Sequence, residues 1–478
     1  MIICRGLIVL MVISLGASAQ QQGNIWVFPN GNLLDFSSNP PQVSDGTQIL
    51  PSDVEVEGVA SISDQDGNLL FYSDGVKLWD WQHNVISSSL MGHQSSTNSA
   101  YVVPVPTALD EYYLFTLDAM QNNLYNGLMY NKIDACRENG VSITVANQQL
   151  SLNMSEKMTA IRHQNGQDYW LVTHEFATDV FKVFLITDQG ISLNGSFSCG
   201  SIHGPEMSAV VGQMKASPSG NFIAINISNM QRTDIVSFDK ALGSVNCLLS
   251  FPPDTSLSGS FRSIYGASFS PSSRFLYISG GSRFRLWQFD LNELAQSDEA
   301  FYSSKYTLSD DDFQSGSSFH QLQLGNDGKI YCASWDNEHL AVIHEPDLSG
   351  FSCAFEDSAI VLENVGNYGL PAFIDSYDYT ITGTCDTSVA VEEETRPSEL
   401  TVFPSPTTNQ LNITLSTNQK ATAIGMLDML GREVLRQSAP YPEALQGYTL
   451  DVSHLPAGNY VAAVFTEVGV LRKRIVIE

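Results

Sequence analysis

A short pattern recurs through the middle of the chain at nearly even spacing, and it limits the fold more than any other feature. In each copy a polar turn precedes a run of alternating aromatic and aliphatic residues, as in DGNLLFYSDG from Asp66 and SGNFIAINIS from Ser219. The turn residues are 43, 56, 54, 53 and 55 residues apart and comprise Gly67, Asp110, Gly166, Gly220, Ser273 and Gly328. A period of about fifty residues with β-type alternation is typical of a β-propeller.

Each copy continues into a second alternating run, of which the clearest are residues 179–190, 234–243, 284–293 and 339–350. Aromatic and β-branched residues favour such half-buried strands, and helical spacing is limited to about two turns at residues 291–300. Residues 24–36 and 366–382, at the two ends of this region, also indicate strands. If they pair in one composite blade, the ring closes and hides both edges. We therefore expect an all-β chain dominated by a propeller of seven blades, with six or eight as alternatives.

The N-terminal residues indicate export. Residues 1–5 are a short basic stretch, residues 6–15 are almost wholly apolar, and residues 17–19 are a small-residue cleavage site. We predict a signal peptide over residues 1–19 and a mature chain that starts at Gln20. The apolar run is too short to span a bilayer, and no later stretch is long enough to do so. No transmembrane segment is expected in the mature chain.

The charge of the chain limits its partners. Acidic side chains outnumber basic ones by 51 to 23, which gives a formal net charge of -28. Such a surface repels polyphosphates and anionic lipid, so nucleic-acid binding is not expected.

Six cysteines remain after the predicted signal peptide is removed. They are Cys136, Cys199, Cys247, Cys332, Cys353 and Cys385. An even number in an exported chain permits three disulfides, and six cysteines allow 15 pairings. Their wide and irregular spacing leaves the pairing open, so we expect a disulfide without predicting which two residues form it.

The last segment, residues 400–478, carries a series of ordered motifs. It opens with TVFPSP, continues with MLDMLGREVLRQ, and ends with LDVSHLPAGNYVAAVFTEVGVLRKRIVIE. This series resembles the type A C-terminal sorting domain of the type IX secretion system. The residues that carry the resemblance are Pro404, Pro406, Asp428, Gly431, Arg432, Ser453, Leu455, Gly458, Tyr460, Arg472, Lys473 and Arg474. Ser405 departs from the Asn that the family usually has there.

The resemblance implies a small β-sandwich that the type IX secretion machinery recognises at the outer membrane. It further implies removal of the sandwich and either attachment of the remainder to surface lipopolysaccharide or its release. The protein is then expected outside the cell or on the outer cell surface. An immunoglobulin-like adhesive module is the alternative, because it shares similar length and alternating strands.

Residues 386–399 separate the two predicted domains, the propeller at residues 20–385 and the sorting domain at residues 400–478. They contain three consecutive glutamates and one proline, with few apolar residues, which predicts an exposed linker. The central region also resembles the propeller-type exported proteins that carry this sorting domain, through NIWVF, ISDQDGNLLFYSDG and GLPAF. That resemblance implies an architecture and no particular activity.

Asp64, Asp66 and Asn68 are the candidate metal ligands. Oxygen atoms at alternate positions are typical of the first half of a calcium-binding loop, but the later bidentate glutamate of such loops is missing. Asp-Gly before a hydrophobic strand is above all a hairpin turn. We expect no cofactor, with Ca²⁺ at these three residues as the alternative.

Histidines and tryptophans supply the candidate binding residues. His163, His174, His203 and His320 meet at the ring centre if each lies on an inner strand, although propeller channels are often lined by polar groups without a chemical role. Trp79 and Trp81 share one face of a strand and are the best candidates for a surface that stacks on sugars. Most tryptophans lie in the repeated strands, where packing between blades is the simpler interpretation.

Catalytic motifs are missing from the sequence. It contains no HExxH, no G-x-S-x-G elbow, no C-x-x-C and no phosphate-binding glycine loop. We therefore expect a secreted or surface-displayed propeller that binds a protein or glycan without catalysis. An exported enzyme that cleaves polysaccharide or peptide at the channel mouth is the alternative, and a subunit of the motility or secretion apparatus is a third hypothesis.

Overall fold

The computed structural model describes residues 21–45, 56–108, 110–137, 140–253, 264–280, 284–311, 318–377, 379, 400–404, 406–415, 421–427, 432–438, 447–466 and 470–477. The chain divides into two compact units, Met1–Cys385 and Asp386–Glu478. The predicted signal peptide at residues 1–19 and the predicted linker at residues 386–399 lie outside the described residues. Within the described ranges, no helix is both long and apolar enough to cross a membrane.

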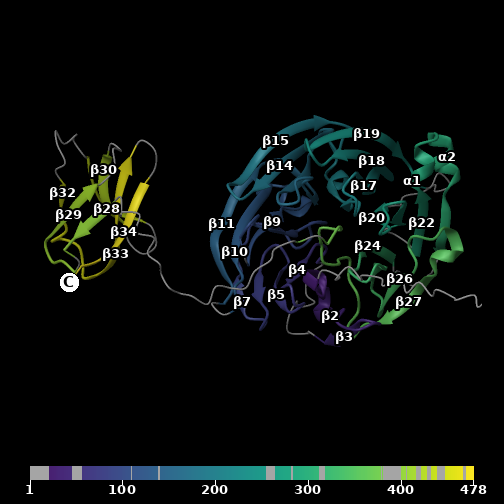
Figure 1. Ribbon diagram of the computed structural model, residues 1–478, viewed down its shortest axis with the longest axis horizontal. Coiled ribbons are helices and arrows are strands. Elements are labelled where there is room, and N and C mark those ends of the chain that lie inside the picture. The colour runs from purple at the N-terminus through teal and green to yellow at the C-terminus, as the bar shows by residue number, and fades with distance from the viewer. Residues whose placement is uncertain are drawn as a thin grey trace, which may run out of the picture. The chain divides into compact units, whose positions relative to one another are not determined.

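The first unit is a β-propeller. Its described residues form seven antiparallel sheets around a ring (Figure 1), which confirms the predicted seven blades. The first strands of neighbouring blades contact one another, so they line the channel and the last strands lie at the rim.

The strands of each blade follow one another in sequence. Blades 1 to 4 comprise β1 (Ile25–Phe28), β2 (Asn32–Asp35) and β3 (Gln42–Asp45); β4 (Ala60–Ser63), β5 (Leu69–Ser73), β6 (Leu78–Asp80) and β7 (Val85–Ser87); β8 (Ala100–Pro104), β9 (Glu111–Leu117), β10 (Leu128–Asp134) and β11 (Ser142–Ser151); β12 (Met154–Arg162), β13 (Tyr169–Glu175), β14 (Val180–Thr187) and β15 (Gly190–Ser198). Blades 5 to 7 comprise β16 (Met214–Ala216), β17 (Phe222–Ile227), β18 (Arg232–Asp239) and β19 (Ser244–Phe251); β20 (Ile264–Phe269), β21 (Phe275–Gly280), β22 (Phe284–Asp290) and β23 (Tyr306–Asp311); β24 (Ser318–Leu324), β25 (Ile330–Trp335), β26 (His339–Ile343) and β27 (Phe355–Val361).

Helices are short and lie in the connections. They are η1 (Gln21–Gly23), η2 (Pro29–Gly31), η3 (Met120–Asn122), η4 (Met207–Val210), η5 (Ser228–Met230), η6 (Gly350–Cys353), α1 (Leu291–Leu294) and α2 (Asp298–Ser303). The two α-helices fall where the sequence predicts about two helical turns, and each has a side-chain cap: Asp290 accepts the Asn292 N–H and Ser297 accepts the Ala300 N–H.

The repeat in the sequence marks one turn of the backbone. All six repeat turn residues lie between the first and second strands of a blade, and all have positive φ, from 54° at Asp110 to 85° at Gly67. Glycine adopts this conformation freely, and Asp tolerates it better than most residues. The residue that opens the turn also accepts hydrogen bonds: Asp64 Oδ1 accepts the backbone N–H of Asp66 at 2.9 Å and that of Asn68 at 2.8 Å. In blade 2 the polar turn therefore fixes the inner hairpin.

Blade 1 contains a seventh copy of this turn, in NGNLLDF, which corresponds to DGNLLFY of blade 2. Asn30 and Gly31 have φ values of 65° and 72°, and β1 pairs with β2 from Ile25 to Phe28. The N-terminal residues thus form a complete inner hairpin by themselves. The described residues of 366–382 add no strand to this sheet, so the predicted composite blade of residues 24–36 and 366–382 is wrong.

Side chains close the ring between the last blade and the first. The Trp26 and Tyr331 rings lie 5.3 Å apart, and the Asn326 side-chain amide donates to Asn24 Oδ1 at 2.5 Å. Trp26 is fully buried, as are Trp170 and Trp287 in other blades. Large aromatic side chains therefore fill the wedges between blades.

Residues 366–377, which we name the channel segment, follow blade 7 and lie among the inner strands. Pro371 forms an isolated parallel bridge with Val59, and the Leu370 N–H donates to Gln321 Oε1 of β24 at 2.9 Å. The Tyr101 hydroxyl of β8 donates to the carbonyl of Phe373. Because these partners belong to different blades, the channel segment runs through the channel and occupies it.

The second unit is a β-sandwich. One sheet has the order β28 (Leu400–Phe403), β29 (Gln410–Leu415), β32 (Tyr448–Asp451), and the other has the order β31 (Glu433–Ser438), β30 (Ala421–Leu427), β33 (Gly458–Thr466), β34 (Val470–Ile477). Leu411 and Ile413 of the first sheet share a core with Ile424 and Val464 of the second. Alternating apolar positions on each strand supply this core.

Candidate functional site

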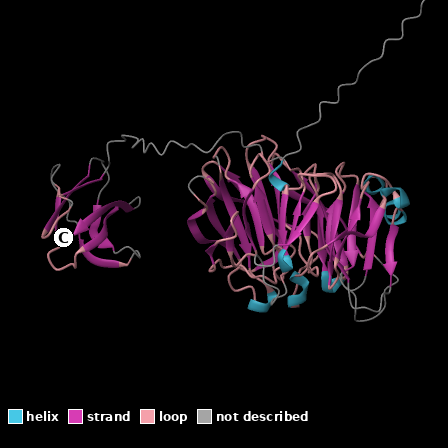
Figure 2. Ribbon diagram, turned by 90° about the horizontal axis from the view of Figure 1, so that it is seen from below, coloured by secondary structure: helices cyan, strands magenta, loops and turns pink. Residues whose placement is uncertain are grey.

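The channel has two different ends. Each four-stranded blade returns the chain to the face where it began, so the inner strands of these blades run in the same direction. We name the face with the repeat turns the turn face, and the face with the connections between blades, such as residues 93–98 and 199–213, the loop face. Figure 2 shows the strands crossing between the two faces.

A buried ion pair holds the channel segment in place. Lys215 Nζ of β16 lies 2.8 Å from Asp375 Oδ1, and each side chain is 2% exposed. Gln323 of β24 joins both partners, because its Oε1 accepts from Lys215 at 2.6 Å and its Nε2 donates to Asp375 at 3.0 Å. Burial raises the pKa of Asp375, and Lys215 acts in the opposite direction. The charge of Asp375 is thus balanced inside the propeller.

Two buried carboxylates lie towards the loop face and are held by hydroxyl and backbone donors. Glu57 Oε1 accepts from the Ser95 hydroxyl at 3.0 Å, and Glu57 Oε2 accepts from the Tyr265 hydroxyl. Glu156 Oε2 accepts both the N–H and the hydroxyl of Thr97 at 3.0 Å. Burial raises the pKa of Glu156. These contacts make the two carboxylates part of the scaffold.

His174 and His203 lie side by side near the loop face. Their ring centroids are 3.5 Å apart with an angle of 15° between the planes, and both side chains are fully buried. Burial lowers the pKa of His174 to about 3 and that of His203 well below its ordinary value, and nearby Lys157 lowers both further. The Lys157 ammonium donates to the carbonyls of residues 210, 211 and 212 at 2.6, 2.9 and 3.1 Å. The two imidazoles are therefore neutral side chains of the core.

The other two predicted histidines lie elsewhere. His320 is buried, with Nε2 2.7 Å from Ser318 Oγ, and burial lowers its pKa to about 3. His163 follows the end of β12 on the turn face, where its ring lies 5.0 Å from that of Trp170. The structure thus brings together His174 and His203 and does not gather all four histidines, because His163 lies beyond the opposite end of an inner strand.

The predicted tryptophan pair does not form an exposed platform. Trp79 is 3% exposed and stacks on Tyr72, with 5.1 Å between ring centroids. Trp81 lies beyond the end of β6, where the Arg137 guanidinium is 5.3 Å from its ring. Trp79 therefore packs within its blade and cannot stack on a sugar.

Asp64, Asp66 and Asn68 form the inner hairpin turn of blade 2. The Asn68 side-chain amide donates to Asp64 Oδ2 at 3.0 Å, and the Arg137 guanidinium lies 3.7 Å from the same oxygen. The Asp64 oxygens are thus used by the turn and by a cation of the chain. Among the residues that the structure describes, no three His, Cys, Asp or Glu side chains are grouped so that they could hold a metal ion.

A cavity of about 340 Å³ opens where blades 4 and 5 meet the channel segment on the turn face. Arg162, His163 and Gln164 line it from blade 4, and Ser217, Ser219 and Lys240 line it from blade 5. The channel segment contributes Ile374, Asp375 and Ser376. Of the predicted binding residues, only His163 lies among these lining residues.

Hydrogen bonds to the backbone of the turns hold the basic side chains of this cavity. Lys240 Nζ donates to the Ser219 carbonyl at 2.6 Å, and the Arg162 guanidinium donates to the carbonyl of Gly166. The Trp170 indole donates to the Lys240 carbonyl at 2.9 Å. Sequence reasoning singled out only His163 of this site. Arg162 lies beside the repeat turn of blade 4, but Lys240 lies in the turn between β18 and β19, and nothing in the sequence shows that the two line one cavity.

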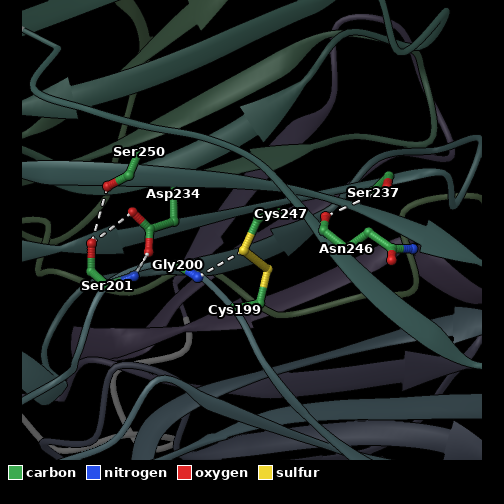
Figure 3. Close-up of a disulfide and its surroundings, with 8 residues drawn as sticks. All are labelled: Cys199, Gly200, Ser201, Asp234, Ser237, Asn246, Cys247 and Ser250. Carbon is green, nitrogen blue, oxygen red and sulfur yellow. Dashed lines mark hydrogen bonds between the residues drawn. A yellow bond between two sulfur atoms is a disulfide. The ribbon is translucent and has the colours of Figure 1, made fainter.

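One disulfide of the described residues, Cys199–Cys247, joins the residue after β15 of blade 4 to the outer strand β19 of blade 5 (Figure 3). Beside it, the Asp234 carboxylate accepts the Ser201 N–H at 2.6 Å and the Ser201 hydroxyl at 3.0 Å. Cys136, Cys332 and Cys353 are buried free thiols, and Cys385 lies outside the described residues. The disulfide and the carboxylate together tie the connection after β15 to blade 5.

The sorting motifs occupy the sandwich. Pro404 and Pro406 are exposed near the end of β28, as is Arg432 before β31, whereas Asp428 and Gly431 lie outside the described residues. Gly458 begins β33, Leu455 packs against the core, and the Tyr460 hydroxyl donates to the Pro456 carbonyl at 2.9 Å.

Residues 401–478 match the family described as the secretion system C-terminal sorting domain. The second unit is a sorting domain. The chain is therefore an exported β-propeller protein that the type IX secretion machinery delivers to the cell surface or the outside. No curated protein matches the chain.

Three solved structures illustrate what the chain is similar to. A functionally unknown protein from Desulfotomaculum acetoxidans is 13% identical, with a TM-score of 0.41, and the match covers 73% of this chain and 98% of that one. The periplasmic gluconolactonase of Pseudomonas aeruginosa is 11% identical, with a TM-score of 0.36 and coverage of 80% and 94%. Streptogramin B lyase is 10% identical, with a TM-score of 0.37 and coverage of 73% and 87%. These scores are too low to support an inference about activity.

Proposed function

We propose that the propeller is a non-catalytic binding module which the sorting domain delivers to the cell surface or the outside, and that the turn-face cavity holds its ligand. The observation that carries this proposal is the cavity itself, which has about 340 Å³ and a lining rich in polar and basic side chains. Ligand sites are typically concave, largely preformed and equipped with a few placed polar groups.

The carboxylates of the channel support a binding role over hydrolysis. Glycosidases usually need two carboxyl groups about 5–10 Å apart that face the scissile bond. Among the described residues that line the cavity, Asp375 is the only carboxylate, and its charge is balanced by Lys215. Glu57 and Glu156 are buried and accept hydrogen bonds from the scaffold.

The proposal is tested by binding of the mature chain, residues 20–478, to glycan and surface-protein arrays. Ser219→Tyr places a large ring in the cavity and is expected to abolish binding. Ser272 occupies the corresponding position of the blade 6 turn, where the sequence SPSS matches SPSG of blade 5. It does not line this cavity. Ser272→Tyr is therefore the matched control and should bind like the wild type.

Two results would contradict the proposal. Unchanged binding by Ser219→Tyr would place the ligand elsewhere on the propeller. Conversion of the captured ligand by the wild-type chain would show that the module is an enzyme.

A further inference from the structure

We propose that the turn-face cavity takes a carboxylate-bearing sugar, a terminal uronic acid residue of an acidic glycan. This inference rests on the proposed function and specifies the ligand class of that same site. It is carried by the charge, the hydrogen-bonding groups and the shape of the cavity.

The charge of the cavity is opposite to that of the chain. Arg162 and Lys240 come from neighbouring blades and both line the cavity, whereas its only described carboxylate, Asp375, is 2.8 Å from Lys215. The chain as a whole has 51 acidic and 23 basic side chains. A local positive site attracts an anionic group, whereas the surrounding acidic surface repels it, so an anionic ligand is directed to this cavity.

Both cations line the same cavity, so both have donors to offer to one anion. A guanidinium has five N–H donors in a fixed fork and an ammonium has three. Lys240 directs one hydrogen bond of 2.6 Å to the Ser219 carbonyl, which fixes the side chain and leaves ammonium capacity for a ligand. Charge-assisted hydrogen bonds from such groups to a carboxylate are about twice as strong as neutral ones.

Gly220 leaves room for the Lys240 side chain. Its φ is +71°, and an added Cβ would lie 2.7 Å from Lys240 Cδ and 2.8 Å from Ile161 Cγ2. The Lys240 stem therefore packs directly over a turn that tolerates no side chain. The glycine of the repeat supplies both the turn and the room for the cation.

The remaining lining suits a sugar better than a peptide. Ser217, Ser219 and Gln164 offer hydroxyl and amide groups to sugar hydroxyls, and Ile374 supplies an apolar wall. The cavity is built from hairpin turns, whereas a peptide that adds as a strand needs an exposed sheet edge. With about 340 Å³, it has the size of a small-ligand site.

The test measures binding of the mature chain to trigalacturonic acid and to its methyl ester by titration calorimetry. The two probes differ in charge and share the sugar skeleton. The acid should bind at least about tenfold more tightly than the ester, because each lost charge-assisted contact costs roughly that factor. Arg162→Gln and Lys240→Gln should each weaken acid binding by about tenfold, and added salt should weaken it in the wild type.

Lys329→Gln is the matched control, because Lys329 is a basic residue of the blade 7 turn that does not line the cavity. It should bind the acid like the wild type. Each variant should have the same thermal unfolding midpoint as the wild type, which would establish that a loss of binding does not come from a loss of fold.

The outcomes separate this inference from the proposed function. In one outcome the acid and the ester bind with equal affinity, and that binding survives Arg162→Gln and Lys240→Gln but not Ser219→Tyr. This result would refute the inference that the ligand is anionic, while the cavity would remain a binding site. Acid binding that survives Ser219→Tyr overturns both. Absence of binding to either probe, together with Arg162-dependent capture of an acidic peptide, overturns the sugar.

Discussion

Breaking the ion pair between Lys215 and Asp375 should loosen the centre of the propeller. Both side chains are 2% exposed and lie 2.8 Å apart, and Gln323 bonds to each. Removal of one partner leaves an uncompensated charge in a buried site, which costs about 3–5 kcal/mol of unfolding free energy. We expect a loss of this size for Lys215→Met and for Asp375→Asn. The double variant should lose less than the sum, since it buries no unpaired charge.

Urea unfolding followed by tryptophan fluorescence measures this effect. All six tryptophans lie in the first unit, so the signal reports on the propeller alone. Ser272→Tyr, on an exposed turn, serves as a control for substitution as such. Single variants within about 1 kcal/mol of the wild type, or strictly additive losses, would refute the reasoning that this pair anchors the channel segment.

Three further predictions concern acid, the disulfide and export. The pKa of His174 and of His320 is lowered to about 3 in the fold, while the unfolded chain has the ordinary value of 6.5. The contribution of each neutral histidine to the unfolding free energy is therefore fully present above pH 6.5. It is lost as the pH falls from 6.5 to about 3, by about 1.4 kcal/mol per pH unit, because the unfolded chain takes up the proton first. Urea unfolding at several pH values gives the slope of the unfolding free energy against pH, which should be shallower for His320→Gln than for the wild type. Equal slopes would contradict the account. Cys199 and Cys247 close a loop with a sequence separation of 48, so replacing both by Ala should lower the unfolding free energy by about 4 kcal/mol. An unchanged urea midpoint would contradict this stabilising role of the disulfide. Removal of residues 400–478 should trap the protein in the periplasm, as measured by fractionation, and normal display of the truncated chain refutes the sorting role.

The repeat was predictable from sequence because it reports a backbone requirement. Gly67, Gly220 and the other repeat turn residues occupy positive-φ positions, which few residue types tolerate. The copy at Asn30 and Gly31 departs from the period, because it lies only 36 residues before Gly67 whereas the other copies are at least 43 residues apart. The sorting domain was predictable for a different reason, since its motifs are ordered along one short segment.

The channel segment and the cavity were not predictable. GLPAF has the composition of a strand, but its partners are side chains and backbone groups of different blades, among them Gln321 and Tyr101. Arg162 and Lys240 lie 78 residues apart in the sequence and meet only because blades 4 and 5 are neighbours in the ring. Two residues that come together from different blades produce no repeating pattern in a single sequence, so the sequence does not predict that they line one cavity.

A crystal structure of the mature chain with trigalacturonic acid tests the central claim most directly. The account predicts the sugar in the turn-face cavity, with its carboxylate between the Arg162 guanidinium and the Lys240 ammonium. A sugar bound instead at the loop face, beside Glu57 and Tyr265, would contradict it.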